Sequence, residues 1–193
     1  MKIRTQADIA QLEKVPVAEH VPHRNILDLV QHAGQAYKGR TAIRYLAGTG
    51  PQDAVRDVTF EELAAATLQT ANLLRAHGIG PDDTVTLLMP SVPETFFALW
   101  GAEVAAIANP VNYFLNASQI AGIMKEAKAK ALIAAGPSIF PDIWPKVDAI
   151  RAALPGLKVF RVGGTGSAPE VGVIEFEKAL AEQPGDRLVA PKK

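Results

Sequence analysis

The sequence contains no cysteine, which excludes disulfide bonds, thiolate catalysis and cysteine-ligated zinc. It also has no excess of charge of either sign, since 20 Lys and Arg residues balance 20 Asp and Glu residues. Nothing in that balance favours nucleic acid or an anionic membrane surface as a partner. No segment approaches the roughly 20 apolar residues of a transmembrane helix, and the polar N-terminus lacks the apolar core of a secretory signal. We therefore expect no nucleic-acid partner, no transmembrane segment and a cytoplasmic location.

The short motifs of several catalytic classes are missing as well. The sequence has no G-x-S-x-G nucleophile elbow and no H-E-x-x-H metal motif. Its four histidines do not form a convincing set of metal ligands, because they fall on an extended segment, a helix and a helix end. They are His20, His23, His32 and His77. We expect no catalytic residue and no metal site within this chain.

What the chain does contain is enough apolar material for a folded domain. Its 193 residues are 48% hydrophobic, which suits one domain with an appendage and argues against disorder. The zero net charge also removes electrostatic repulsion between copies, and so allows a homodimer.

Three pairs of residues have the spacing of a capping box, which predicts the start of a helix. The pairs are Thr59 with Glu62, Ser91 with Glu94, and Asn116 with Gln119. Gly78 is expected to end the first of these helices, because glycine adopts the left-handed conformation that closes a helix.

Strands alternate with these helices. Residues 84–89 and 130–135 are almost unbroken apolar runs, as in parallel strands buried on both faces. Residues 41–46 and 55–60 predict a hairpin, and helices are predicted over 142–154 and 173–183. The alternation predicts an α/β fold, with a mainly parallel sheet and helices on both faces, preceded by a partly extended N-terminal arm.

The predicted domain organisation has three parts. Residues 1–40 form the N-terminal arm and a helix that Asn25 caps, with 15–24 extended over a surface. Residues 41–183 form the α/β subdomain. Residues 184–193 are predicted to be a frayed tail.

Three segments in order carry a resemblance to a known family. They are VTFEEL, LLRAHGIGPDDTVTLLMPSVPE and GAEVAAIANPVN, within residues 58–135. This run resembles the first part of the adenylate-forming acyl-CoA synthetases. Most of its residues also have a structural explanation: Glu62 caps a helix, and Gly101 and Ala102 allow close packing of a helix on the sheet.

The resemblance implies a parent enzyme, an AMP-forming acid–thiol ligase. Such an enzyme activates a carboxylic acid, with fatty acids favoured here, using ATP and magnesium to give acyl-AMP, which it then transfers to coenzyme A. In the family a Ser/Thr/Gly-rich phosphate loop ending in Pro-Lys comes later, and none precedes Lys193. We therefore expect this chain to be the incomplete N-terminal segment, with the remainder of the enzyme as its partner, no cofactor of its own and no activity alone.

Asn109 and Asn112 are the candidate ligand-binding residues. They belong to a turn, 109–113, that should lie beyond the carboxyl ends of the strands, where ligands gather in open α/β sheets. The resemblance implies that this turn borders the channel for coenzyme A. The alternative is that both asparagines only satisfy local hydrogen bonds of the turn.

The glycine-rich segment 163–170 resembles a phosphate loop only superficially. Glu170 occupies the position where the family carries lysine, and its carboxylate would repel phosphate. A solvent loop is therefore favoured. Two other functions stay open: an interaction module that dimerises through an exposed sheet edge, and a small nucleotide-binding enzyme that uses this loop.

Overall fold

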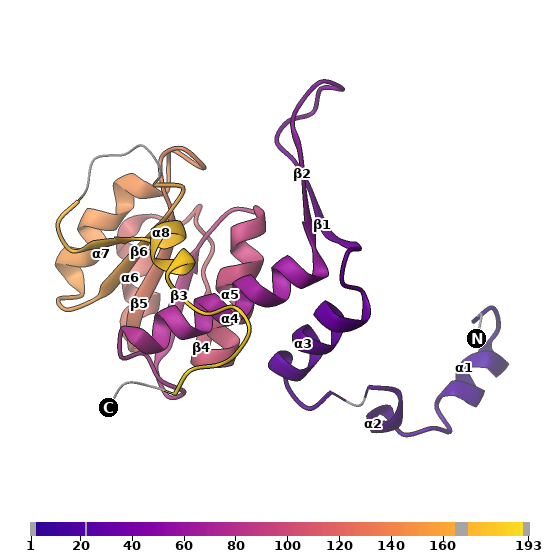
Figure 1. The fold of residues 1–193 in the computed structure, drawn as a ribbon. Coiled ribbons are helices and arrows are strands. Elements are labelled where there is room, and N and C mark those ends of the chain that lie inside the picture. The colour runs from indigo at the N-terminus through magenta and orange to yellow at the C-terminus, as the bar shows by residue number, and fades with distance from the viewer. Residues whose placement is uncertain (1–2, 22, 165–169, 191–193) are drawn as a thin grey trace.

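The computed structural model of the protein describes residues 3–21, 23–164 and 170–190. Its body is a five-stranded parallel sheet with helices on both faces, and a two-stranded hairpin and an N-terminal segment stand out from it (Figure 1). The predicted fold class is confirmed. Across the described ranges, no helix combines the length and the apolar character needed to cross a bilayer.

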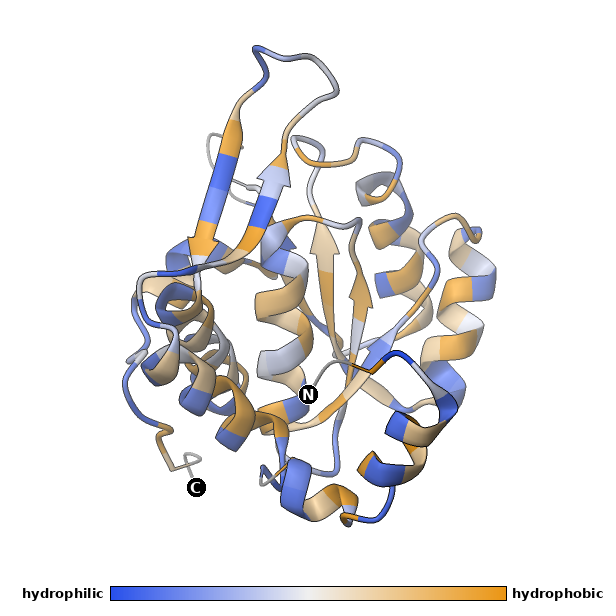
Figure 2. Ribbon diagram, turned by 90° about the vertical axis from the view of Figure 1, so that its right-hand side faces the viewer, coloured by the Kyte–Doolittle hydropathy of each residue, from blue (hydrophilic) through white to orange (hydrophobic). Residues whose placement is uncertain are grey.

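The sheet has the strand order β4-β3-β5-β6-β7. Its strands are β3 (Thr84–Leu88), β4 (Ile107–Pro110), β5 (Ala129–Ala135), β6 (Lys158–Val162) and β7 (Val173–Glu175). The central strands are the most apolar part of the body (Figure 2), and every residue of β3 is buried. Burial on both faces explains why these strands are apolar runs rather than alternating patterns.

Helices cover the sheet in two groups, on its opposite sides (Figure 2). One group comprises α4 (Phe60–Ala76), α5 (Pro93–Ala105) and α8 (Phe176–Ala181), and the other α6 (Ala117–Glu126) and α7 (Val147–Ala153). Outside the body lie α1 (Gln6–Leu12), α2 (Val17–His20), α3 (Ile26–Ala36) and the antiparallel hairpin of β1 (Thr41–Leu46) and β2 (Val55–Thr59). Of these, α3 packs against α4.

Two of the three predicted capping boxes are present. The Thr59 hydroxyl accepts from the Glu62 amide at 3.2 Å, while the Glu62 carboxylate accepts from the Thr59 amide at 2.7 Å. Asn116 and Gln119 form the same reciprocal pair at the start of α6. Gly78 follows α4 with φ of 74°, so the predicted helix end is confirmed.

The third capping box is wrong. Helix α5 begins at Pro93 with Val92 as its N-cap, and no side chain caps it. The Glu94 carboxylate instead pairs with the guanidinium of Arg56, at 2.5 Å, on strand β2 of the hairpin. The local spacing predicted that the Glu94 carboxylate caps the start of α5. It binds Arg56 instead, which lies 38 residues earlier in the sequence.

Gly101 marks a close approach between α5 and α4. A Cβ built on Gly101 would lie 2.5 Å from Thr70 Cγ2 and 3.0 Å from the Thr67 carbonyl oxygen. Both threonines donate their hydroxyls to carbonyls of their own helix, so Thr70 presents its methyl group to α5. The predicted close packing exists, but Gly101 packs on a helix rather than on the sheet.

The predicted frayed tail is wrong for its described residues, 184–190, which run along α4. Residues 191–193 lie outside the described part of the chain. The side-chain amide of Asn72 donates to the Pro184 and Arg187 carbonyls, both at 2.8 Å, and its oxygen accepts from the Val189 amide at 2.8 Å. Asn72 is almost fully buried. A single asparagine thus satisfies three backbone groups of a segment that has no regular structure of its own.

Three further boundaries differ from the sequence prediction. The predicted helix over 173–183 is split, because its first residues pair with β6 as strand β7 and only then form α8. The predicted helix over 142–154 starts with a 3-10 turn, Trp144–Lys146, before α7. The extended segment 15–24 contains the short helix α2.

We expect Gly101→Ala to lower the free energy of unfolding by about 1–3 kcal/mol, because the new methyl group overpacks the α4–α5 contact. Gly122→Ala in α6 is the matched control. No atom lies within 4 Å of a Cβ built there, so this variant should gain about 0.5–1 kcal/mol from its higher helix propensity. Urea denaturation of both variants tests this, and equal effects would contradict the close-approach explanation.

We expect Asn72→Ala to lower the free energy of unfolding by about 1–3 kcal/mol, because three hydrogen bonds to the tail are lost together. Limited proteolysis should then cut the chain after Gln183. Gln69→Ala, which removes a single hydrogen bond to the Gln183 carbonyl one turn earlier, should have a smaller effect. If the C-terminal segment of the Asn72→Ala variant resists protease as well as that of the unchanged chain, Asn72 does not hold this segment against α4.

Candidate functional site

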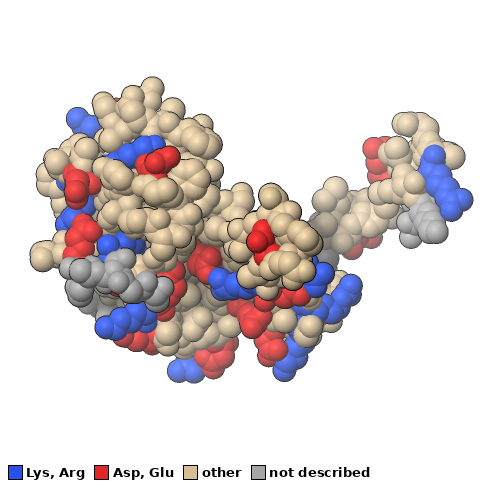
Figure 3. Space-filling model, turned by 90° about the horizontal axis from the view of Figure 1, so that it is seen from above, with Lys and Arg blue, Asp and Glu red and all other residues tan. Residues whose placement is uncertain are grey.

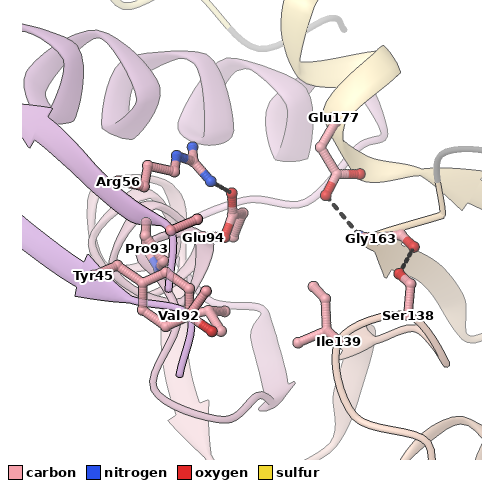
Figure 4. A pocket seen from close by; sticks show the side chains of 11 residues that line it. Tyr45, Arg56, Val92, Pro93, Glu94, Ser138, Ile139, Gly163 and Glu177 are labelled. Carbon is pink, nitrogen blue, oxygen red and sulfur yellow. Dashed lines mark hydrogen bonds and ion pairs between the residues drawn. The ribbon is translucent and has the colours of Figure 1, made fainter. Parts of the chain in front are cut away.

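The carboxyl ends of all five strands lie along one edge of the sheet, and the hairpin stands over that edge (Figure 1). In open parallel sheets this edge is the usual place for a ligand. A hollow of about 720 Å³ lies here, between the hairpin and the loops that follow the strands (Figure 4). Its polar side chains are those of Tyr45, Arg56, Glu94, Ser138 and Glu177.

The hairpin side of the hollow carries the Arg56–Glu94 ion pair. Glu94 belongs to the first turn of α5, and its side chain is only 13% exposed, whereas that of Arg56 is 53% exposed. The Glu94 carboxylate is therefore the more buried partner, and the Arg56 guanidinium is the partner on the solvent side. Because half of the Arg56 side chain is in water, the ion pair adds little to the stability of the fold. Its main effect is to position the hairpin relative to α5.

On the opposite side of the hollow, the polar groups hydrogen-bond to one another. The amide of Gly163 donates to the Glu177 carboxylate at 2.6 Å, and the Ser138 hydroxyl donates to the Gly163 carbonyl (Figure 4). Gly163 adopts φ of 74°, a left-handed conformation that suits glycine. Strand β6 is thereby joined to α8 and to the loop after β5.

Glu177 is a carboxyl group of this hollow whose pKa is shifted by its surroundings. Burial raises the pKa of the Glu177 carboxyl, and the Gly163 amide opposes the shift by donating to the charged form. The carboxylates of Glu94 and Glu175 raise the pKa of Glu177 further. Such a shifted carboxyl at a strand edge is typical of functional sites, although it also occurs in purely structural networks.

A phosphate loop keeps its backbone amides free to bind phosphate. In segment 163–170, both described ends are instead bound to other groups of the protein. The Gly163 amide is bound to a carboxylate, as just described. At the other end, Glu170 pairs with Arg151 at 3.0 Å and accepts from the indole N–H of Trp144 at 3.3 Å. Residues 165–169 lie outside the described part of the chain.

Glu170 also belongs to a buried cationic centre on β6. Arg161 is only 4% exposed; it pairs with Glu175 and with Glu170, and its guanidinium lies over the Trp144 ring at 5.1 Å. Two carboxylates and an aromatic face compensate the burial of this charge. The negative charge of Glu170 therefore has a structural role.

Both predicted site residues make hydrogen bonds within the protein. Asn109 lies inside β4 and donates to the Thr86 hydroxyl, at 3.2 Å, on the neighbouring strand β3. Asn112 lies in the following turn, is exposed, and accepts from the Phe114 amide at 3.0 Å. Asn112 uses its oxygen in this bond, and no described residue accepts a hydrogen bond from its NH₂ group.

Aromatic rings gather beside that turn. Tyr113 contacts Phe114 and Phe140, with ring centroids 4.6 Å and 5.2 Å apart, and the Phe114 side chain is 74% exposed. The Lys146 ammonium donates to the Tyr113 carbonyl at 2.5 Å. The turn thus presents an amide, an aromatic face and a cation close together.

The two predicted asparagines and the residues that line the hollow lie at the same edge of the sheet, but the asparagines lie outside the hollow. Neither Asn109 nor Asn112 is among the described residues that line the hollow. The sequence analysis missed Arg56, Ser138 and Glu177, because each belongs to a different element and no local spacing joins them. Glu94 was predicted only as a helix cap.

The histidines remain apart from this edge. The rings of His23 and His32 contact one another at 4.6 Å, and the ring of His77 meets the edge of Phe160 at 5.4 Å. Within residues 3–21, 23–164 and 170–190, no three His, Asp or Glu side chains are grouped so that they could hold a metal ion.

Comparison with known sequences identifies relatives of this chain. A sequence profile of the family described as AMP-binding enzyme matches residues 30–186. Marinolic acid–CoA ligase of Pseudoalteromonas sp. is 31% identical over 187 residues, covering 97% of this chain and 28% of the relative. A long-chain-fatty-acid–CoA ligase of Mycobacterium tuberculosis is 31% identical over 146 residues, covering 74% and 28%. The chain spans little more than a quarter of the length of these curated relatives.

Solved structures agree on the fold. An acyl-CoA synthetase of Brucella canis has a TM-score of 0.72 at 20% identity, covering 99% of this chain and 34% of that structure. The anthranilate–CoA ligase AuaEII, in complex with anthranoyl-AMP, has a TM-score of 0.71 at 22% identity, covering 93% and 31%. These matches give no support to the alternative that the chain is an independent interaction module that dimerises through a sheet edge. The chain belongs to the AMP-binding enzyme family.

Proposed function

We propose that the protein to which this chain belongs is an AMP-forming acyl-CoA ligase, and that the chain is its N-terminal segment. The observation that carries this proposal is the family match over residues 30–186, together with relatives that are named as CoA ligases. Fatty or other simple carboxylic acids are the favoured substrate class.

The proposed reaction has two steps. The carboxylate oxygen of the acid attacks the α-phosphorus of ATP, forms acyl-AMP and releases pyrophosphate. The thiol of coenzyme A then attacks the acyl carbon, AMP leaves, and the thiol proton passes to solvent. Magnesium accompanies ATP in this scheme.

We further propose that this segment supplies scaffold rather than phosphate contacts. Among the described residues of the glycine-rich segment, the Gly163 amide donates to Glu177, and Glu170 is bound by Arg151 and Arg161. A single preorganised donor to developing charge contributes about 3 kcal/mol to catalysis. The segment without such donors is therefore expected to be inert alone.

The turn after β4 is the part of this segment that we propose faces coenzyme A. Asn112 is exposed, and the NH₂ group that its bond to Phe114 leaves unused can donate to a ligand. The exposed ring of Phe114 offers a face for stacking. Asn109 would act from inside the strand, through the oxygen that its bond to Thr86 leaves unused. The turn follows the carboxyl end of β4, where ligands of open α/β sheets bind.

The 193-residue chain alone should show no ATP–pyrophosphate exchange with any carboxylic acid, because it presents no described phosphate contact. The whole protein, with a panel of fatty, short-chain and aromatic acids, ATP, magnesium and coenzyme A, should release pyrophosphate and form the thioester. Exchange by the isolated chain would refute its inertness, and a whole protein that forms no acyl-AMP from any acid would refute the ligase assignment.

In the whole protein, Asn112→Ala should weaken coenzyme A binding about two- to thirteenfold, the effect of one lost hydrogen bond of about 0.5–1.5 kcal/mol. Asn112→Asp is the matched control for structure, because it keeps the acceptor for the Phe114 amide but removes the donor. Both variants should retain acyl-AMP formation and lose affinity in the thioester step. If neither variant changes the KM for coenzyme A, the turn does not face it.

A further inference from the structure

A row of polar side chains on helix α4 holds the C-terminal segment, residues 184–190. Its members Gln69, Asn72 and Arg75 are three residues apart and therefore share one face of the helix. Asn72 makes the three hydrogen bonds described above, and Gln69 binds the carbonyl just before the segment. Arg75 donates to the Val189 carbonyl at 2.9 Å. The row thus anchors the segment near both of its ends.

Close packing keeps the same segment against the backbone of α4. A Cβ built on Gly185 would lie 3.1 Å from the Ala65 Cβ and 3.3 Å from the Ala65 carbonyl oxygen. Leu188 packs against the main hydrophobic core. Figure 1 shows the segment, in yellow, running alongside α4 toward the C-terminus. The path of these residues is therefore set by α4, which is itself packed on α3, α5 and α8.

On the proposed function, the two steps of the reaction use different parts of the protein. The groups that bind the phosphates of ATP come from the part that follows this chain, because the N-terminal part is proposed to supply scaffold only. Coenzyme A, by contrast, meets the turn of Asn112 and Phe114 on the N-terminal part. Thioester formation therefore needs both parts in the correct relative position, whereas acyl-AMP formation needs only the following part.

Surface charge does little to orient two such parts. Acidic and basic residues are intermingled on the face seen in Figure 3, and the chain as a whole has no net charge. A surface of mixed sign exerts no strong orienting field on a neighbouring part. The covalent connection is the one contact that any continuation of the chain must have, and residues 184–190 are the described residues closest to it in sequence.

We propose that Asn72 is a positioning residue for thioester formation. By holding residues 184–190 on α4, it sets where the following part of the protein stands relative to the turn that meets coenzyme A. This role rests on the proposed function, because only a chain that continues into the rest of a ligase has such a part to position. Asn72 is almost fully buried, so it acts through the C-terminal segment and not on a substrate.

In the whole protein, Asn72→Ala should slow thioester formation from supplied acyl-AMP roughly ten- to hundredfold at saturating coenzyme A, the effect of a misplacement of about 1 Å. ATP–pyrophosphate exchange should keep its rate, because the groups for that step lie in the following part. The KM for coenzyme A should also stay unchanged, since the turn is intact. That separates Asn72→Ala from Asn112→Ala, which should raise this KM.

Two further variants separate positioning from stability. Arg75→Ala removes the single bond to the Val189 carbonyl and should slow the thioester step by a smaller factor. It carries the same test if Asn72→Ala does not fold. Ile150→Val removes one methyl group from the core beneath α7, on the other side of the sheet, and is the control for lost stability. It should affect the two steps equally, because it only lowers the folded fraction.

An equal loss in both steps for Asn72→Ala and Arg75→Ala means that the row only stabilises the fold, and the positioning role is then wrong. It is equally wrong if proteolysis shows the C-terminal segment released while thioester formation runs at its full rate. An unchanged whole protein that forms no acyl-AMP contradicts the ligase assignment, and the positioning role with it. An active protein whose variants show no selective loss overturns the positioning role alone.

Discussion

The close approach of α4 and α5 at Gly101 is the constraint on which most of this structure depends. Helix α4 also contacts α3, the hairpin and α8, and it holds the C-terminal segment through Asn72. A side chain at position 101 would push α5 away from α4, and α5 begins at the hollow beside the hairpin. The hairpin contacts α4 directly and α5 through the Arg56–Glu94 ion pair, so its position over the sheet edge depends in part on how these two helices pack.

The chemistry of the sheet edge follows from parallel topology. Five parallel strands bring their carboxyl ends together, so loops that are distant in sequence share one surface. On one part of that surface carboxylates are held by amides and guanidinium groups, as Glu177 is by Gly163 and Glu170 by Arg151. On another part, the turn after β4 leaves an amide and an aromatic ring exposed. The first part serves the fold, and the second is the part that we propose meets a ligand.

Local signals predicted the elements that depend on local contacts. The capping boxes at Thr59 and Asn116 join residues three apart, and both are present. The equivalent signal at Ser91 failed, because Arg56 of the hairpin takes the carboxylate of Glu94. The C-terminal segment failed for the same kind of reason, since its partner Asn72 lies more than a hundred residues earlier. Of the candidate residues at this sheet edge, the sequence analysis named the two asparagines, whose role stays a prediction. It named none of Arg56, Ser138 and Glu177, which come together only through the fold.

The amino-acid sequence by itself determined the class of fold, the positions of most helices and strands, and the family resemblance, because apolar periodicity and capping act over a few residues. Tertiary structure decided which charges meet, where the last residues run and what surrounds each strand end. Those outcomes depend on contacts between distant elements, whose geometry is set by side-chain packing and not by local spacing. The buried charge of Arg161, compensated by two carboxylates and an indole ring from separate segments, is an arrangement that no local pattern contains.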